Sequence, residues 1–498
     1  MGTTLGATQT DAATPVRRAR RVGVEAGHEH YKWWALSCTS LGMLLATTNS
    51  GTLIIALPDL ERELGTSLLA LVWVILAYMI ASTVLVLTCG RLSDLFGRKR
   101  AYVAGFVVFA AASLGAGFAA DGTQLILWRV FQGVGAAFLF ANASALVTDA
   151  FPREQLGVAM GTNVMVAAIG LVLGPVLGGA LVSIGWQWVF WFNVPLALAG
   201  SLWGWLILHE LARPDSVRGF DPLGTLTFVA GLTGLVLGIS KGGLSGWGDP
   251  VVLVSLVAAA ILLPLFVLIE HRGRAPMLDL TIFQNRLFAA ATGAAFINGL
   301  SRFALMFVFV FYFQGAQGDD PITAGVKLAP LALGMLISSP LAGAWADRRG
   351  SRALAALGML VTAAGLAGMT MLEADTSYWL AAVWMFVVGI GSGMFNSPNT
   401  AAMMGTVPPH RRGIAAGARM MLQNTGAILS IAFVLAVITA AVPRDVLFKI
   451  FSGLASGLTN AQLAPFIANM HTALWVLAAV SVLGAVVSLL RPRQGAEA

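Results

Sequence analysis

Long uninterrupted runs of apolar residues are the feature that most restricts how this chain can fold. A run of about 20 apolar residues can cross the hydrocarbon core of a bilayer as a helix, and such runs recur from Trp33 to Leu490. Charged residues make up 11% of the chain, against about 25% in soluble domains. The sequence therefore predicts an all-α integral membrane protein. The pattern does not predict a membrane β-barrel, because alternating apolar and polar residues are absent.

The apolar runs divide into fourteen predicted transmembrane helices. They cover roughly residues 34–58, 68–89, 101–119, 123–150, 157–183, 188–208, 222–240, 250–269, 287–314, 323–345, 353–372, 377–404, 413–441 and 471–490. An even number places both termini on the same side of the membrane. Lysines and arginines concentrate in the loops of that side, and the other loops hold only Arg62, Lys241, Lys327, Arg444 and Lys449. This imbalance predicts a plasma-membrane protein with both termini in the cytoplasm.

An internal repeat divides these helices into two sets. Gly90-x-x-x-Asp94-x-x-Gly97-Arg98 recurs 253 positions later as Gly343-x-x-x-Asp347-x-x-Gly350-x-Arg352. Two further matches recur at an offset of 256 positions, which predicts two parallel six-helix halves, the geometry of alternating access. The predicted domains are a disordered cytoplasmic tail (1–32), an N-terminal six-helix bundle (33–210), two inserted transmembrane helices (211–275), a C-terminal six-helix bundle (276–490) and a cytoplasmic tail (491–498).

The repeated loop has a spacing with a physical meaning. Gly90 and Gly97 permit a tight turn and close helix approach, and Asp94 can sit near the start of the next helix, where the helix dipole favours an anion. Arg98 can reach Asp149 at the inner end of the fourth predicted span. A plain positively charged loop with a capping aspartate would explain the charges. It would not explain the glycine spacing or its recurrence.

Three motifs together resemble a known family. Gly90-x-Leu92-x-Asp94-x-x-Gly97-Arg98-Lys99, the span-four sequence Arg129-Val-Phe-Gln132-Gly133-Val-Gly135, and the span-five sequence from Gly170 to Gly179 are similar to motifs of the major facilitator superfamily. With fourteen spans, residues 34–490 look like its drug:proton antiporter branch.

The resemblance implies a proton-driven exporter and assigns roles to its motif residues. The loop and its repeat would form a conformational latch made of Gly90, Asp94, Gly97, Arg98, Asp149, Gly343, Asp347 and Arg352. The span-five motif would act as a hinge through Gly170, Gly174, Pro175, Gly178 and Gly179, although glycine-rich packing alone is the alternative. In this family the arginine at position 129 is associated with proton transfer, and Gln132 lies one turn away. A snorkelling arginine is the alternative for Arg129.

One position departs from the family pattern. Members commonly carry an acidic residue before a run ending Ala-Leu-Pro, and this chain has Asn49 there. Asparagine cannot titrate, so we expect the proton-coupling carboxylate at an edge of the bundle, with Asp149, Asp319 and Asp320 as candidates. Arg302 lies in mid-span without an acidic neighbour in sequence, which favours anionic, zwitterionic or neutral amphipathic substrates.

Polar and aromatic side chains within the spans are candidates for a substrate cavity between the halves. They are Asn49, Tyr78, Asn142, Asn298, Arg302, Phe311, Asn396 and Asn424. Interhelical hydrogen bonding and packing are the alternatives for each of them. In the equivalent inner loops of the two halves, Glu154 and the pair Arg411 and Arg412 can form a cytoplasmic gate.

The sequence thus predicts a secondary active transporter that exports small organic compounds (drug or metabolite efflux) in exchange for protons. An exporter of lipid or of an anionic endogenous metabolite, with weak or no proton coupling, is the alternative. A non-transporting membrane enzyme or sensor is a remote one. No phosphate-binding loop, catalytic cluster or metal-ligand cluster is evident, so we expect no ATP, cofactor or metal. The expected partners are a small-molecule substrate, protons and the lipid bilayer, without nucleic acid.

Overall fold

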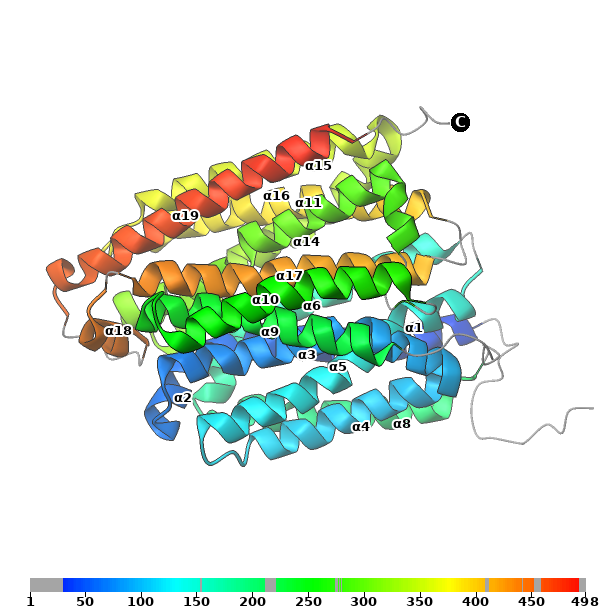
Figure 1. Cartoon of the computed structure of the whole chain (residues 1–498), viewed down its shortest axis with the longest axis horizontal. Helices are drawn as coiled ribbons and strands as arrows, with labels where there is room; N and C mark the ends of the chain where they lie inside the picture. The colour runs from blue at the N-terminus through cyan, green and yellow to red at the C-terminus, as the bar shows by residue number, and fades with distance from the viewer. Residues whose placement is uncertain are drawn as a thin grey trace, which may run out of the picture.

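The computed structural model describes residues 30–152, 155–210, 221–273, 276, 278, 280–407, 412–440, 442–451 and 458–491. Within these ranges all regular secondary structure is helical. The predicted tail before residue 30 and the tail after residue 491 lie outside the described residues. The helices run nearly parallel to one another along the long axis of the molecule (Figure 1). This arrangement satisfies the backbone polar groups within each helix, as a lipid environment requires.

The helices follow one another in two comparable series. The first series is α1 (Tyr31–Ile55), α2 (Leu57–Leu64), α3 (Leu68–Phe96), α4 (Arg98–Ala116), α5 (Gly122–Ala150), α6 (Leu156–Val182), α7 (Trp188–Trp191) and α8 (Asn193–Ile207). Two helices follow it, α9 (Pro222–Ser245) and α10 (Pro250–Arg272). The second series is η2 (Leu280–Gln284), α11 (Arg286–Arg302), α12 (Ala304–Val310), η3 (Phe311–Ala316), α13 (Pro321–Lys327), α14 (Ala329–Arg349), α15 (Ser351–Gly368), η4 (Met369–Met371), α16 (Tyr378–Gly405), α17 (Arg412–Thr439), α18 (Arg444–Phe451) and α19 (Asn460–Leu489).

Twelve helical segments of the described chain are long and apolar enough to cross a membrane. The two other predicted spans, 101–119 and 157–183, coincide with α4 and α6, which run alongside the twelve (Figure 1). α4 has 19 residues and begins with Arg98, Lys99 and Arg100, which shortens its apolar part. Several predicted spans are not single helices: the structure breaks them at Phe192, Phe303 and Leu328. The short helices α2 and α18 were not predicted.

The two series form bundles with the same neighbours. In the first bundle α3 packs against α5, α4 against α5 and α8, and α1 against α6. In the second, α14 packs against α16, α15 against α16 and α19, and α11 against α17. The second glycine of each repeated loop also has the same backbone, with φ 102° at Gly97 and 84° at Gly350. Only glycine adopts this region readily, which explains why both loops contain it.

The inserted pair covers the line where the two bundles meet. α9 packs against α3 of one bundle and α17 of the other, and Figure 1 shows it between them. The hydroxyls of Thr88 on α3 and Thr225 on α9 lie 3.1 Å apart. α10 packs on α9 and presents apolar side chains outward, among them Val254 and Val257. The inserted pair therefore covers one flank of the seam and does not form a third bundle.

The bundle has two chemically different ends. The basic end carries the start of α4 with Arg98, Lys99 and Arg100, together with Arg272 and Arg286. The opposite end, at the left of Figure 1, carries α2 and α18. The end with the start of α4 is the basic end, and the end with α2 and α18 is the opposite end.

Candidate functional site

The two bundles touch directly at the opposite end. A Cβ atom at Gly179 of α6 would lie 2.5 Å from the carbonyl oxygen of Pro321 and 2.6 Å from Ile322 Cα, both in the second bundle. One turn away on α13, Gly325 lies against the carbonyl oxygen of Pro175. The amide of Gln314 donates to the carbonyl of Ile55 at 3.2 Å. Backbone therefore meets backbone here, and the seam is closed at this end.

The remaining glycines of the predicted hinge face the other way. Gly170, Gly174 and Gly178 pack against α1 of their own bundle. A Cβ at Gly174 would lie 2.8 Å from Gly51 Cα, and one at Gly178 would lie 2.6 Å from the carbonyl oxygen of Thr52. Small residues thus bring α6 close to α1 on one face and to α13 on another. Pro175 lies inside α6 and leaves the helix without one internal hydrogen-bond donor.

At the basic end the structure contains the predicted contact between Arg98 and Asp149. Nη1 of Arg98 lies 2.8 Å from both carboxylate oxygens. A second carboxylate that the sequence reasoning missed completes the arrangement: Glu210 accepts from the backbone N–H of Arg98 at 2.8 Å and of Lys99 at 3.1 Å. The carboxylate of Glu210 therefore caps the N-terminus of α4, and a Cβ at Gly97 would lie 2.5 Å from it.

For the other predicted latch residues, the structure gives either a neighbouring residue, a degree of burial or no described side chain. Gly90 lies near the Cβ of Ala141 on α5, and Gly343 lies near Ser397 on the equivalent α16. Arg352 is half-buried at the start of α15. The side chains of Asp94 and Asp347 lie outside the described residues, as do the predicted gate residues Glu154 and Arg411 and the side chain of Arg412.

A buried polar network lies inside the first bundle, toward the opposite end. Arg129 of α5 is fully buried; its Nε donates to the carbonyl of Val74 at 2.9 Å, and its guanidinium lies 4.3 Å from the ring centroid of Tyr78. Its Nη1 donates to the amide oxygen of Gln132. The amide nitrogen of Gln132 in turn donates to Asn49 at 3.2 Å. The network therefore joins a buried cation to Asn49, the position that departs from the resembled sequence pattern.

Two further residues of this network were not predicted. Ser113 accepts from Gln132 at 2.7 Å, and Asn193 donates to the amide oxygen of Asn49 at 3.2 Å. The amide nitrogen of Asn49 has no hydrogen-bond partner within the described chain. In this structure Asn49 is thus an acceptor, as a carboxylate at the same place would be.

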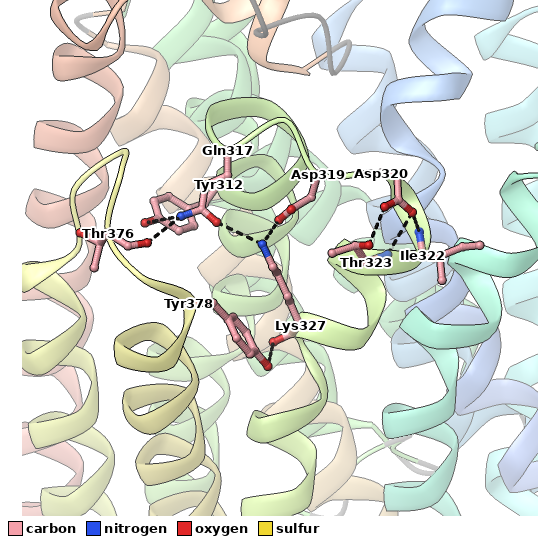
Figure 2. Close-up of polar contacts among 9 residues, drawn as sticks. All are labelled: Tyr312, Gln317, Asp319, Asp320, Ile322, Thr323, Lys327, Thr376 and Tyr378. Atoms are coloured by element: carbon pink, nitrogen blue, oxygen red, sulfur yellow. Dashed lines mark hydrogen bonds and ion pairs between the residues drawn. The ribbon is translucent and has the colours of Figure 1, made fainter.

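The acidic residues of the opposite end are held by neighbours, as Figure 2 shows. Asp319 pairs with Lys327, whose ammonium also lies 5.3 Å from the ring centroid of Phe313. Asp320 caps α13: it accepts from the backbone N–H of Ile322 at 3.0 Å and of Thr323 at 3.1 Å. Hydrogen bonds from Thr323 lower the pKa of Asp320 below its ordinary value. Both carboxylates therefore make contacts within their own segment: Asp320 caps the start of α13, and Asp319 pairs with Lys327 at its end.

Glu61 is a buried carboxylate that the sequence reasoning missed. It lies on α2, is 4% exposed, and its Oε2 has no hydrogen-bond partner in the described part of the chain. Burial raises its pKa from 4.5 to about 7, because the charged form loses hydration. Leu57, Leu60 and Leu64 share a helix face with it, so the spacing on α2 already indicated burial.

The predicted cavity residues divide by exposure. Tyr78, Asn142, Asn298 and Phe311 are buried in helix contacts; for example, Asn142 donates to Ser93 at 2.8 Å. Asn396 of α16 and Asn424 of α17 keep part of their surface exposed. Arg302 is 6% exposed and lies between α11 and α14, where its Nη1 approaches the sulfur of Met335 at 3.6 Å.

Two similar helical bundles that meet at a seam are the architecture of many secondary membrane transporters. The profile of the Major Facilitator Superfamily matches residues 39–431 and 291–498. The chain belongs to this superfamily. It is a transporter and not an enzyme.

Several curated relatives are similar along most of their length. The chain is 35% identical to a puromycin resistance protein of Streptomyces alboniger, over 83% of either chain. It is 31% identical to the tetracenomycin C resistance and export protein of Streptomyces glaucescens, over 83% of this chain and 77% of the relative. It is 26% identical to a riboflavin transporter of Clostridioides difficile (strain 630), over 93% of this chain and 98% of the relative.

A solved structure shares the fold. It is a bacterial homolog of the human lysosomal transporter Spinster in an inward-facing, unoccupied conformation, with a TM-score of 0.66 and 16% identity over 93% of this chain and 98% of that one.

Proposed function

We propose that this protein exports small organic compounds across the plasma membrane in exchange for protons, by alternating access of its two bundles. The observation that carries the proposal is the closed contact between Gly179 and Ile322. Close backbone contact between small residues is compatible with α6 and α13 separating as rigid surfaces. Relatives named for antibiotic resistance and for export support the outward direction of transport.

The distribution of charge supports the orientation. Arg98, Lys99 and Arg100 lie at the basic end, and loops rich in lysine and arginine remain in the cytoplasm. The closed opposite end then faces outward. On this orientation both termini are cytoplasmic, residues 33–210 and 276–490 are the two moving bundles, and residues 211–275 are the inserted pair.

We assign proton coupling to Asp149 and Asp319, two carboxylates that form ion pairs with basic side chains at the two ends of the bundle. Protonation of Asp149 would remove the charge that binds Arg98 and so release the latch. Protonation of Asp319 would similarly release Lys327 and α13. Arg129 and Gln132 belong to a hydrogen-bonded network that joins α5 to Asn49 on α1.

The test uses purified protein in proteoliposomes with an imposed pH gradient. We expect the gradient to drive transport of a fluorescent organic dye, and Asp149→Asn to reduce that transport at least tenfold. Asp375→Asn is the matched control, because Asp375 is exposed in a loop at the opposite end. Transport that ignores the gradient in the wild type would rule out proton exchange.

One observation favours a second candidate. Asn49 cannot carry a proton, and no carboxylate joins the Arg129 network within the described residues. An exporter of lipid or of an anionic metabolite with weak or no proton coupling would need no acid there. Dye counterflow that is equal with and without the pH gradient would support this candidate.

A further inference from the structure

Arg419 is a second arginine within the second bundle that the proposed function does not use. It lies on α17, seven residues after the helix begins at the basic end. Gly417, two residues earlier, contacts Leu87 of α3 in the other bundle. The backbone of Arg419 is therefore near the seam, about 10 Å along α17 from the start of that helix.

The side chain of Arg419 is held by a chain of hydrogen bonds. Its Nη1 donates to the amide oxygen of Gln423 at 2.8 Å, and the amide nitrogen of Gln423 donates to Asn396 at 3.0 Å. Asn396 is anchored in turn by the carbonyl of Ser392 at 3.1 Å. Two helices, α16 and α17, thus fix the guanidinium. A fixed guanidinium loses less side-chain entropy when it binds a ligand.

The charge of Arg419 is not neutralised by the described part of the chain. Ion pairs such as Arg98 with Asp149 and Lys327 with Asp319 occur there, but none of those recorded includes Arg419. Arg419 and its two partners Gln423 and Asn396 all keep part of their surface exposed. A charge inside a membrane bundle faces a partner or a water-filled cavity, and no ion-pair partner of Arg419 lies among the described residues.

Arg302 provides an internal comparison. It is almost completely buried, its Nε has no partner among the described residues, and its guanidinium lies 4.9 Å from the ring of Phe303. Gly299, one turn before it, contacts the backbone of Gln423. The two arginines are therefore separated by about seven helix residues, or about 10 Å, along parallel helices. Arg302 is enclosed by its neighbours, whereas Arg419 keeps part of its surface exposed.

We propose that Arg419, positioned by Gln423 and Asn396, binds an anionic group of the transported compound, such as a carboxylate, sulfonate or phenolate. A guanidinium presents paired N–H donors that match such groups. The inference rests on the proposed function, since it names the substrate class of that transporter. Arg419 is the recognition residue, and Gln423 and Asn396 are positioning residues.

The test compares two dyes with the same ring system and opposite charge, sulforhodamine B (anionic) and rhodamine 6G (cationic). Binding to detergent-purified protein is measured by fluorescence anisotropy, which needs no pH gradient. We expect the wild type to prefer sulforhodamine B, and Arg419→Gln to raise its Kd about tenfold or more. Binding of rhodamine 6G should change less than twofold. Gln423→Glu should have the same effect as Arg419→Gln, because the new carboxylate would pair with the arginine.

Two variants separate recognition from folding. Arg272→Gln makes the same substitution at an exposed position of α10 and should leave both dyes unaffected. Arg419→Lys keeps the charge but loses the paired donors, so we expect an intermediate Kd. A wild type that binds rhodamine 6G more tightly, or neither dye, overturns the inference. Sulforhodamine B binding that survives Arg419→Gln also overturns it. If anion binding depends on Arg419 but no pH-driven transport occurs, the proposed function fails and this site remains.

Discussion

Gly179→Ala adds one methyl group at the place where the two bundles touch. Its Cβ would lie 2.5 Å from the Pro321 oxygen and 2.6 Å from Ile322 Cα, whereas ordinary contacts begin at 3.4 Å. Both neighbours are backbone atoms, so no side chain can rotate away. α13 must then move from α6 by roughly 1 Å.

The cost of this displacement falls on the closed state alone. Overpacking of this kind costs about 1–3 kcal/mol, which lowers the ratio of closed to open protein by about 5- to 150-fold. The higher helix propensity of alanine, about 1 kcal/mol over glycine, stabilises both states alike and leaves this ratio unchanged. We therefore expect Gly179→Ala to populate a conformation open at the opposite end.

Thiol labelling measures this shift. Ala324 on α13 is fully buried, so Ala324→Cys reports opening by its rate of reaction with a membrane-impermeant maleimide. The natural Cys38 and Cys89 are both buried and give a low background. We expect labelling to accelerate at least fivefold in the Gly179→Ala background.

The matched control for this experiment is Gly293→Ala. Gly293 also lies inside a helix, α11, but nothing within 4 Å would meet its Cβ. We expect this variant to label at the wild-type rate and to be slightly more stable. Equal labelling rates in Gly179→Ala and Gly293→Ala would refute the steric reasoning and the role of Gly179 in closure.

Three further variants test other parts of the structure. Burial raises the pKa of Glu61 from 4.5 to about 7, so the folded protein loses stability as the pH rises between these values. The Glu61→Gln variant should therefore melt at a higher temperature than the wild type above pH 7 but not at pH 4.5. Melting temperatures of the two proteins that run parallel across this pH range would contradict this expectation. Glu210→Gln removes the negative charge at the N-terminus of α4 and should destabilise the protein by about 0.5–1 kcal/mol, measured as a lower melting temperature, and an unchanged value would argue against the cap. Asn49→Asp places a carboxylate beside Gln132, so dye export should become at least tenfold more dependent on the pH gradient in proteoliposomes; a gradient dependence like that of the wild type would show that position 49 is not a coupling site.

Parts of the candidate site were predictable because they lie in short sequence motifs. Gly97 and Arg98 follow from the repeated loop, and the structure contains the contact from Arg98 to Asp149. The glycines from 170 to 179 indicated close helix approach. Their spacing could not reveal that Gly179 faces the second bundle while Gly174 faces α1, because both lie in one uniformly apolar helix.

Other parts were not predictable for a related reason. Glu210 reaches Arg98 across 112 residues of sequence, and Asn193 reaches Asn49 across 144. In a soluble protein the polar face of a helix would indicate which side chains meet. A helix surrounded by lipid and by other helices is apolar on every side, so the pattern does not reveal which face is turned toward a neighbour. The contrast between Arg302 and Arg419 was hidden in the same way.

The sequence by itself determined that this chain is a helical membrane protein with two equivalent halves. Runs of about 20 apolar residues exclude water-soluble folds. Lipid offers no hydrogen-bond partners, so the backbone groups of each segment must pair with one another, as they do in a helix. Only the tertiary structure decided which polar residues meet, which arginine keeps an exposed surface, and that α9 lies along the seam. Those outcomes depend on how helices rotate against one another, and that rotation is set by the packing of small side chains between distant segments.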